Sequence, residues 1–322
     1  MKPTDFTPLE GVNRKHLQQH FSQAAPSYDE AAILQKTVAE RVEERLQLTK
    51  LDIKHLADIG AGTGLLTEKL QRLYPQAHLY AVDFSLPMLQ TARQRLEPKG
   101  MARSVLKNWL PHTLLPQTRL HLVNADAYQL PFADGSLDLL TSNLMLQWCD
   151  DLDSVFREFR RVLRPNGMLM FTSFGPDTLK ELRRAWHQAD PEQTHVNHFI
   201  DMHDLGDALI RAGFGQPVMD VEHFTLTYDQ PMGVLRDLKA IGATHAAANR
   251  SRGLMGKARF QAMLNAYEQA RHDSKIPATY EVVHGHAWAS REILKGPNRD
   301  RSGLVEISLE TFAKQTQQKH RP

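Results

Sequence analysis

The sequence predicts an α/β fold: a doubly wound sheet, mostly parallel with an antiparallel edge strand, preceded by helices and carrying a helical insert before the last strand. Three observations predict it. Short apolar segments alternate with amphipathic helical segments from residue 55 onward, which is typical of a parallel sheet covered on both faces. A glycine-rich loop joins the first strand to a helix, and an acidic residue closes the second strand.

The order of the elements follows from hydrophobic spacing and turn residues. Two helices lead, at 13–23 and 27–47, the second with apolar residues at helical intervals. The alternating part then comprises strands at 55–59, 77–82, 120–123, 137–141 and 168–174, with helices at 64–73, 85–96 and 151–163. Ser85 is a suitable cap for the helix that follows it, and Arg164-Pro165-Asn166-Gly167 predicts a turn before the fifth strand.

The second half has a looser pattern. We expect helices at 177–189 and 201–212, a strand at 217–228, a helical insert at 231–272 and a closing strand at 280–289. This divides the chain into an N-terminal helical cap (1–48), a cofactor-binding core (49–175), the rest of the sheet with its insert (176–290) and a basic, disordered tail (291–322). The irregular segment 98–118 is too long for a simple connection, so it either carries function or is surface padding.

Composition narrows the class of protein. The 322 residues are 41% hydrophobic and 24% charged, which is ordinary for a globular protein and excludes collagen or a disordered chain. A lone cysteine, Cys149, excludes an intrachain disulfide and a Cys-rich zinc site, and it indicates a reducing compartment. With no spanning apolar run and no apolar centre in the first 17 residues, we expect a cytoplasmic protein without membrane contact. A net charge of +2 does not indicate nucleic-acid binding.

The strongest local signal is the run Asp58-Ile59-Gly60-Ala61-Gly62-Thr63-Gly64 at a strand-to-helix junction, with Asp83 at the end of the next strand. Glycines allow a sharp turn and close approach of a ligand, and an acid at this place can accept hydrogen bonds from both ribose hydroxyls. The loop is one residue shorter than a dinucleotide fingerprint and follows an acidic strand residue. This favours a cofactor with a cationic amino acid portion, S-adenosylmethionine, over NAD.

These residues, together with Asp126 after the third strand and the run at 130–138, resemble the class I S-adenosylmethionine-dependent methyltransferases over about 50–175. The resemblance implies a Rossmann-like sheet that binds the methionine part at the first loop, the ribose at the second-strand acid and the adenine near the third-strand acid. The implied cofactor-binding residues are Asp58, Gly60, Ala61, Gly62, Gly64, Asp83, Phe84, Asp126 and Ala127.

Four further segments resemble one branch of that family, the malonyl-[acyl-carrier protein] O-methyltransferases of biotin synthesis. They are 21–29, 142–149, the Arg-Pro-Asn-Gly turn and 238–245, of which the second and fourth are the more particular. The resemblance implies methylation of the free carboxyl of a malonyl thioester on acyl carrier protein, or on coenzyme A. The methyl ester would hide a charge that suits apolar elongation tunnels poorly.

Carboxyl methylation needs neither a general base nor a metal, because the carboxylate is already ionised at neutral pH. Positioning in a dry pocket would supply the catalysis, and a tight arginine clamp would stabilise the ground state too well, so we expect a modest polar grip. The candidates are Tyr28, Asn143, Gln147, Trp148 and His245. Each also has a structural interpretation: packing for the aromatic residues and His245, a turn or cap for the two amides.

An acidic carrier would call for a basic docking face. Candidate cations, any of which could equally be a solvated helix residue, are Arg157, Arg160, Arg161, Arg164, Lys180, Arg183, Arg184, Arg236 and Lys239. Two other functions stay open: a methyltransferase for a quinone or other small apolar molecule, and a non-catalytic module that keeps the cofactor fold. Ser142-Asn143-Leu144-Met145 lacks the base-binding motif of DNA amino methylation, and one cysteine is poor support for RNA cytosine C5 methylation.

Overall fold

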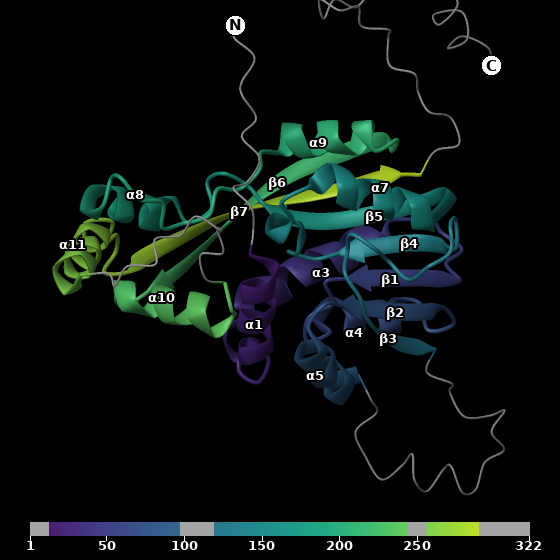
Figure 1. Ribbon diagram of the computed structural model, residues 1–322, viewed down its shortest axis with the longest axis horizontal. Coiled ribbons are helices and arrows are strands. Elements are labelled where there is room, and N and C mark those ends of the chain that lie inside the picture. Colours follow the sequence, from purple (N-terminus) through teal and green to yellow (C-terminus); the bar gives the residue numbers. More distant parts are fainter. Residues whose placement is uncertain (1–12, 97–118, 244–255, 290–322) are drawn as a thin grey trace, which may run out of the picture.

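The computed structural model describes residues 13–96, 119–243 and 256–289 (Figure 1). The leading helices are α1 (Arg14–Ala24), α2 (Tyr28–Ala31) and α3 (Ile33–Gln47). The prediction of one helix over 27–47 was wrong in one respect: Ala32, with ψ of 43°, separates α2 from α3. This break lets α3 pack on the sheet while α2 turns toward the strand ends.

In the described ranges, seven strands form one sheet in the order β3-β2-β1-β4-β5-β7-β6. The strands are β1 (His55–Ile59), β2 (His78–Asp83), β3 (Leu120–Asn124), β4 (Leu137–Ser142), β5 (Leu163–Phe174), β6 (Gly215–Tyr228) and β7 (Ile276–Trp288). Strands β1 to β5 pair in parallel, and β7 lies between β5 and β6 and runs antiparallel to both. The predicted mostly parallel sheet with antiparallel pairing at one edge is confirmed.

The remaining helices connect the strands. They are α4 (Leu65–Leu73), α5 (Leu86–Leu96), the short 3₁₀ helix η1 (Leu146–Trp148), α7 (Leu152–Val162), α8 (Lys180–Ala189), α9 (Met202–Arg211), α10 (Pro231–Ala240) and α11 (Lys257–Glu268). Helices α10 and α11 occupy the predicted insert between β6 and β7. None of the helices in the described ranges has both the length and the apolar character that crossing a membrane requires.

Alternate residues of the central strands pack against helices on opposite faces of the sheet. Leu56 and Leu139 join a buried cluster with α3 and α4, whereas Ala57 and Leu140 join one with α7 and α9. This is the period of two that places successive side chains on opposite faces. A third cluster holds α8, α10 and α11 against the far ends of β6 and β7, which project beyond the central strands (Figure 1).

The predicted turn at 164–167 is a bulge within the first part of β5. Leu137 pairs with Leu163 and Leu139 pairs with Met168, so the six residues 163–168 of β5 lie opposite the three residues 137–139 of β4. Asn166 takes a positive φ of 66° within this bulge, a conformation that asparagine tolerates better than most residues, and its N–H bonds to the carbonyl of Ala289 at 2.7 Å. Helix α7 ends at Val162, just before this segment, as the proline predicts, but the segment belongs to β5 and does not form a separate turn.

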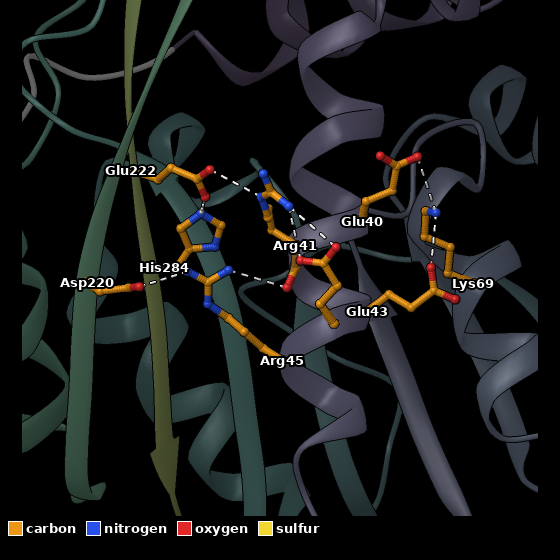
Figure 2. Close-up of polar contacts among 9 residues, drawn as sticks. Glu40, Arg41, Glu43, Arg45, Lys69, Asp220, Glu222 and His284 are labelled. Carbon is orange, nitrogen blue, oxygen red and sulfur yellow. Dashed lines mark hydrogen bonds and ion pairs between the residues drawn. The ribbon is translucent and has the colours of Figure 1, made fainter.

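Helix α3 is also tied to the sheet by charged pairs (Figure 2). Arg41 lies 3.2 Å from the carboxylate of Glu222, and Arg45 lies 2.7 Å from that of Asp220, both on β6. Beneath them, His284 is 3% exposed, and neither ring nitrogen has a hydrogen-bond partner in the described residues; Glu222 approaches to 3.6 Å. Burial, aided by the charge of Arg45, lowers the pKa of His284 to about 4, so the imidazole is neutral at pH 7.

On its other side, α3 is joined to α4 through Lys69 (Figure 2). The ammonium group lies 3.1 Å from the carboxylate of Glu43 and 3.7 Å from that of Glu40. These ion pairs and the apolar cluster between the two helices and the sheet hold α3 and α4 together as one layer. The glycine loop lies at the start of α4.

Candidate active site

A pocket lies at the carboxyl ends of β1 to β4, where open α/β sheets bind their ligands. It encloses about 800 Å³, part of it open to solvent. Helix α1 lies across these strand ends (Figure 1) and supplies one wall through Arg14, Leu17 and Phe21. The pocket is large enough for a cofactor together with a small acceptor group.

The glycine loop forms the floor of the pocket. Gly60, Gly62 and Gly64 all have positive φ, of 73°, 56° and 83°. A Cβ on Gly60 would lie 2.4 Å from Cγ of Met145, whereas one on Gly62 would meet nothing within 4 Å. The Gly62 backbone therefore borders open space that a ligand can approach closely, as the sequence predicts.

Asp83 lies beside this loop and is 6% exposed. Its Oδ2 accepts a hydrogen bond from the N–H of Gly62 and its Oδ1 accepts one from the N–H of Ser85, both at 2.8 Å. Burial raises the pKa of Asp83 to about 6, against the opposing effect of these two bonds. Each oxygen keeps lone-pair capacity, so the carboxylate can still accept from the two hydroxyls of a ribose.

Asp58 lies behind the loop and is absent from the described lining of the pocket. It is 1% exposed and accepts hydrogen bonds from the hydroxyls of Thr67, at 2.6 Å, and Thr141, at 3.3 Å. Burial raises its pKa to about 6. In this position it ties β1 to α4 and β4, and a direct contact with the cofactor stays a prediction. Ala61 and Gly64 likewise do not line the pocket.

The predicted adenine side is formed by Phe84, Asp126 and Ala127, which all line the pocket. The Asp126 carboxylate accepts from the N–H of Tyr128 at 3.0 Å and forms an ion pair with Arg14 of α1. The Arg14 guanidinium also lies 4.4 Å from the centre of the Tyr128 ring. The cap thus contacts the adenine side through charge and stacking as well as through apolar packing.

The five predicted acceptor-binding residues separate into three groups. Tyr28, Asn143 and Trp148 line the pocket. Gln147 does not: it is 9% exposed, its amide donates to the carbonyl of Leu144 at 2.6 Å, and its Oε1 is buried with no partner in the described part of the chain. His245 lies outside the described residues, as do segment 98–118 and the basic tail.

The three lining residues offer a polar but uncharged grip. Burial, together with the charges of Asp83 and Asp29, raises the pKa of Tyr28 far above its usual range, so its phenol remains a neutral donor. Asn143 accepts from the hydroxyl of Thr172 at 2.9 Å and donates to a carbonyl of α3 at 3.3 Å, which fixes its orientation. Trp148 packs edge-on against Phe21 with ring centres 5.4 Å apart, so it is pocket wall, not core.

Several lining residues were not singled out from the sequence, chiefly Arg14, Leu17, Phe21, Met88, Tyr128 and Met145. The first three recur at intervals of three and four along α1, so they share one helix face, and that spacing was the available signal. Cys149 also lines the pocket, but burial raises the pKa of its thiol to about 12. A protonated thiol is a weak nucleophile, which agrees with excluding cysteine-dependent RNA methylation.

The residues present fit S-adenosylmethionine. An open space bordered by Gly62, a buried carboxylate with spare acceptor capacity at Asp83 and apolar walls around Phe84 and Met88 match a ribose with an adenine beside it. Of the described lining residues, only Asp126 has its carboxylate engaged by a cation.

Comparison with known proteins decides the family. Residues 57–171 match the model of a methyltransferase domain. The malonyl-[acyl-carrier protein] O-methyltransferase of Gallionella capsiferriformans (strain ES-2) is 46% identical over 298 residues, which cover 92% of this chain and 97% of that protein. The protein of the same name from Methylovorus sp. (strain MP688) is 48% identical over 277 residues, 86% of this chain and 89% of that protein. The chain belongs to the malonyl-[acyl-carrier protein] O-methyltransferase family.

Solved structures agree on the fold of this O-methyltransferase. The YcgJ protein of Bacillus subtilis superposes with a TM-score of 0.51 at 15% identity, covering 79% of this chain and 99% of that one. The BH2331 protein of Bacillus halodurans C-125 does so with a TM-score of 0.52 at the same identity and coverage. The predictions of a methyltransferase, its cofactor and its family are confirmed. Which side chains touch cofactor and acceptor stays a prediction.

Proposed function

We propose that this protein transfers a methyl group from S-adenosylmethionine to the free carboxylate of a malonyl group held on acyl carrier protein, in the cytoplasm, as the first step of pimeloyl-chain synthesis for biotin. The observation that carries the proposal beyond family membership is the character of the acceptor end of the pocket. Among the described lining residues, Arg14 is the one cationic side chain, and it forms an ion pair with Asp126. The acceptor carboxylate therefore meets neutral donors.

When bound, S-adenosylmethionine supplies a methyl group made electrophilic by a positive sulfonium. The protein's part is to bind, orient and exclude water. Asp83 holds the ribose, and the Gly60–Gly62 backbone allows close approach. Tyr28 and Asn143 orient the acceptor carboxylate with hydrogen bonds too weak to trap it in the ground state.

No side chain has to move a proton, because a carboxylate with a pKa of about 4 is already ionised at neutral pH. The apolar wall of Phe21, Met145 and Trp148 lowers the local dielectric, and this strengthens the attraction between an anionic acceptor and a cationic donor group. Charge is lost as the two react, so a dry pocket favours the transition state over the separated ions.

The structure sorts the candidate docking cations. Arg161 is held by Glu158 and Asp134, and Arg164 by the buried Asp138. Four more form hydrogen bonds or ion pairs within the protein: Arg157, Arg160, Lys180 and Arg183. Arg184, Arg236 and Lys239 are exposed and have no ion-pair partner in the described residues.

Arg236 and Lys239 lie three residues apart on α10, which lies beside α1 (Figure 1). The turn that follows α10 brings Gly242 close enough to α1 that an added Cβ would lie 3.2 Å from the carbonyl of His20. These two cations therefore lie beside α1, where Phe21, the residue after His20, lines the pocket. We assign them the approach of an acidic carrier protein.

The direct test is methyl transfer from labelled S-adenosylmethionine to malonyl-carrier protein, malonyl-coenzyme A and a quinone precursor, measured in parallel. Base-labile label on the malonyl thioesters supports the proposal. Label on the quinone precursor alone would identify a small-molecule methyltransferase. Tight binding of the cofactor without transfer to any of the three would indicate a non-catalytic module.

A further inference from the structure

Helix α2 begins with two adjacent residues that have different surroundings. Tyr28 lines the pocket, and its neighbour Asp29 turns to the outer side of the glycine loop. Oδ1 of Asp29 accepts a hydrogen bond from the hydroxyl of Thr63 at 2.7 Å, and Oδ2 forms an ion pair with Arg95 of α5. One carboxylate therefore connects the cap, the glycine loop and α5.

Thr63 is held at both of its polar groups. Its hydroxyl donates to Asp29, and its carbonyl accepts from Nε of Arg95 at 2.9 Å. It is 1% exposed and lies between Gly62, which borders the pocket, and Gly64, which begins α4. A displacement of Asp29 would remove the hydrogen bond of the Thr63 hydroxyl and the ion pair with Arg95, which would keep its bond to the Thr63 carbonyl and an ion pair with Glu68 at 3.6 Å.

Asp29 is itself held in place. The ammonium group of Lys36, in the first turn of α3, donates a hydrogen bond to the main-chain carbonyl of Asp29 at 2.6 Å. The ion pair with Arg95 is part-buried, with the two side chains 33% and 22% exposed, so solvent screens it less than a pair on the open surface. The hydrogen bond from Thr63 is charge-assisted, which makes it stronger than a bond between neutral groups.

A separate set of contacts fixes α1 alone. Gln18 donates to the carbonyl of Phe84 at 2.5 Å, and the hydroxyls of Ser22 and Ser85 lie 2.9 Å apart. These contacts reach the turn after β2 and leave the glycine loop untouched. The hydrogen bond from Thr63 to Asp29 instead connects the glycine loop directly to the cap.

From these contacts we infer that Asp29 is a positioning residue: it holds the glycine loop in its cofactor-binding shape and, through the same carboxylate, places Tyr28 over the pocket. The inference rests on the proposed function in that the ligand of the loop is S-adenosylmethionine. Loop order and cap position are then coupled, so weakening this contact loosens the grip on the cofactor and also displaces Tyr28 from the acceptor.

The test compares Asp29→Ala and Thr63→Val with Glu30→Ala. Thr63→Val keeps the branched shape and removes only the hydroxyl. Glu30 is the adjacent acid; it is exposed, and its side chain forms no hydrogen bond or ion pair with the described residues, so it is a matched control for charge. Isothermal titration with S-adenosylhomocysteine should show a Kd raised by about tenfold in Asp29→Ala and Thr63→Val, and unchanged in Glu30→Ala.

Two readouts distinguish positioning from a general loss of structure. In folded Asp29→Ala, the KM for S-adenosylmethionine should rise, and the KM for malonyl-carrier protein should rise with it because Tyr28 loses its position, whereas Glu30→Ala should leave both unchanged. In a double-mutant cycle, Asp29→Ala and Thr63→Val should be strongly non-additive, because each removes the same bond. If Asp29→Ala does not fold, Asp29→Asn and Thr63→Val supply the same comparison with smaller changes.

Wild-type Kd values in folded Asp29→Ala and Thr63→Val would overturn the inference, as would additive effects in the cycle. That result is distinct from failure of the proposed function, in which the wild-type protein would transfer no methyl group to malonyl-carrier protein.

Discussion

Replacing Gly62 by alanine should separate cofactor binding from folding. The backbone there has φ of +56°, and a Cβ would have no atom within 4 Å. The free energy of unfolding should therefore fall only by the conformational cost of a left-handed alanine, about 1–2 kcal/mol. In a chain of this size that corresponds to a fall in Tm of a few degrees.

The same methyl group projects into space that the proposed cofactor needs. Adding a methyl group to a packed contact costs about 1–3 kcal/mol, which corresponds to a roughly 5- to 150-fold rise in Kd. Gly60→Ala should behave in the opposite way. Its Cβ would lie 2.4 Å and 2.7 Å from Cγ and Cβ of Met145, so the larger loss should be in stability.

The assay is isothermal titration with S-adenosylhomocysteine, paired with urea denaturation of each variant. Gly206→Ala serves as a control, because Gly206 lies within α9, where nothing is within 4 Å of its Cβ, and alanine is the better helix former. A folded Gly62→Ala protein that binds the ligand with the wild-type Kd would refute the assignment of this loop to the cofactor.

Affinity for S-adenosylhomocysteine should be lost as the pH falls through about 6, because burial raises the pKa of Asp83 to about 6 and only its ionised form accepts from both hydroxyls; a Kd that titration finds constant between about pH 8 and about pH 5 would contradict this. Reversing both charges in Arg236→Glu/Lys239→Glu should raise the KM for malonyl-carrier protein several-fold and weaken the salt dependence of that KM. The KM for malonyl-coenzyme A should not change in this variant, and the matched control Arg157→Glu should keep the wild-type KM for malonyl-carrier protein. Equal effects on both thioesters would argue against a docking face. His284→Leu should make the free energy of unfolding less sensitive to acid. The folded state holds His284 neutral, with a pKa of about 4 against about 6.5 in the unfolded chain, so stability falls as the pH drops from about 6.5 toward about 4. At pH 5 the loss amounts to about 2 kcal/mol. Urea denaturation at neutral and acid pH measures this, and an identical loss in both proteins would exclude the histidine as the cause.

Much of the sheet was predictable because its signals are local. Alternation of apolar strands with amphipathic helices predicts β1 to β4 within one residue, whereas β5 begins at Leu163, five residues before the predicted start. The glycine loop with Asp83 predicts where the ligand binds. These patterns depend on near neighbours in the chain: a strand needs its own period of two, and a tight turn needs its own glycines. The start of β7 was harder to predict: the strand begins at Ile276 and not at 280, because its first residues are fixed by pairing with β6.

The acceptor side of the pocket was harder to predict, because the chemistry of a side chain does not say which way it faces. Asn143 and Gln147 lie four residues apart in one segment, yet Asn143 reaches the pocket and Gln147 packs behind it. Asp58 shares the acidic character of Asp83 but points to Thr67 and Thr141, beneath the loop. Their direction depends on which neighbours the sheet and helices place beside them.

By itself, the sequence determined the fold class and the type of cofactor, since these depend on spacings that each segment carries within itself, and the resemblance of its motifs to known methyltransferases indicated the family. Only the tertiary structure decided that α1 closes the pocket, because Arg14 meets Asp126 across 112 residues of chain. It likewise decided that Asp29 contacts the glycine loop, and that Arg161 and Arg164 form ion pairs whereas Arg236 and Lys239 have no ion-pair partner within the described ranges. Pairing of charges depends on distance in space, and folding sets that distance by packing apolar faces that carry no information about the charges themselves.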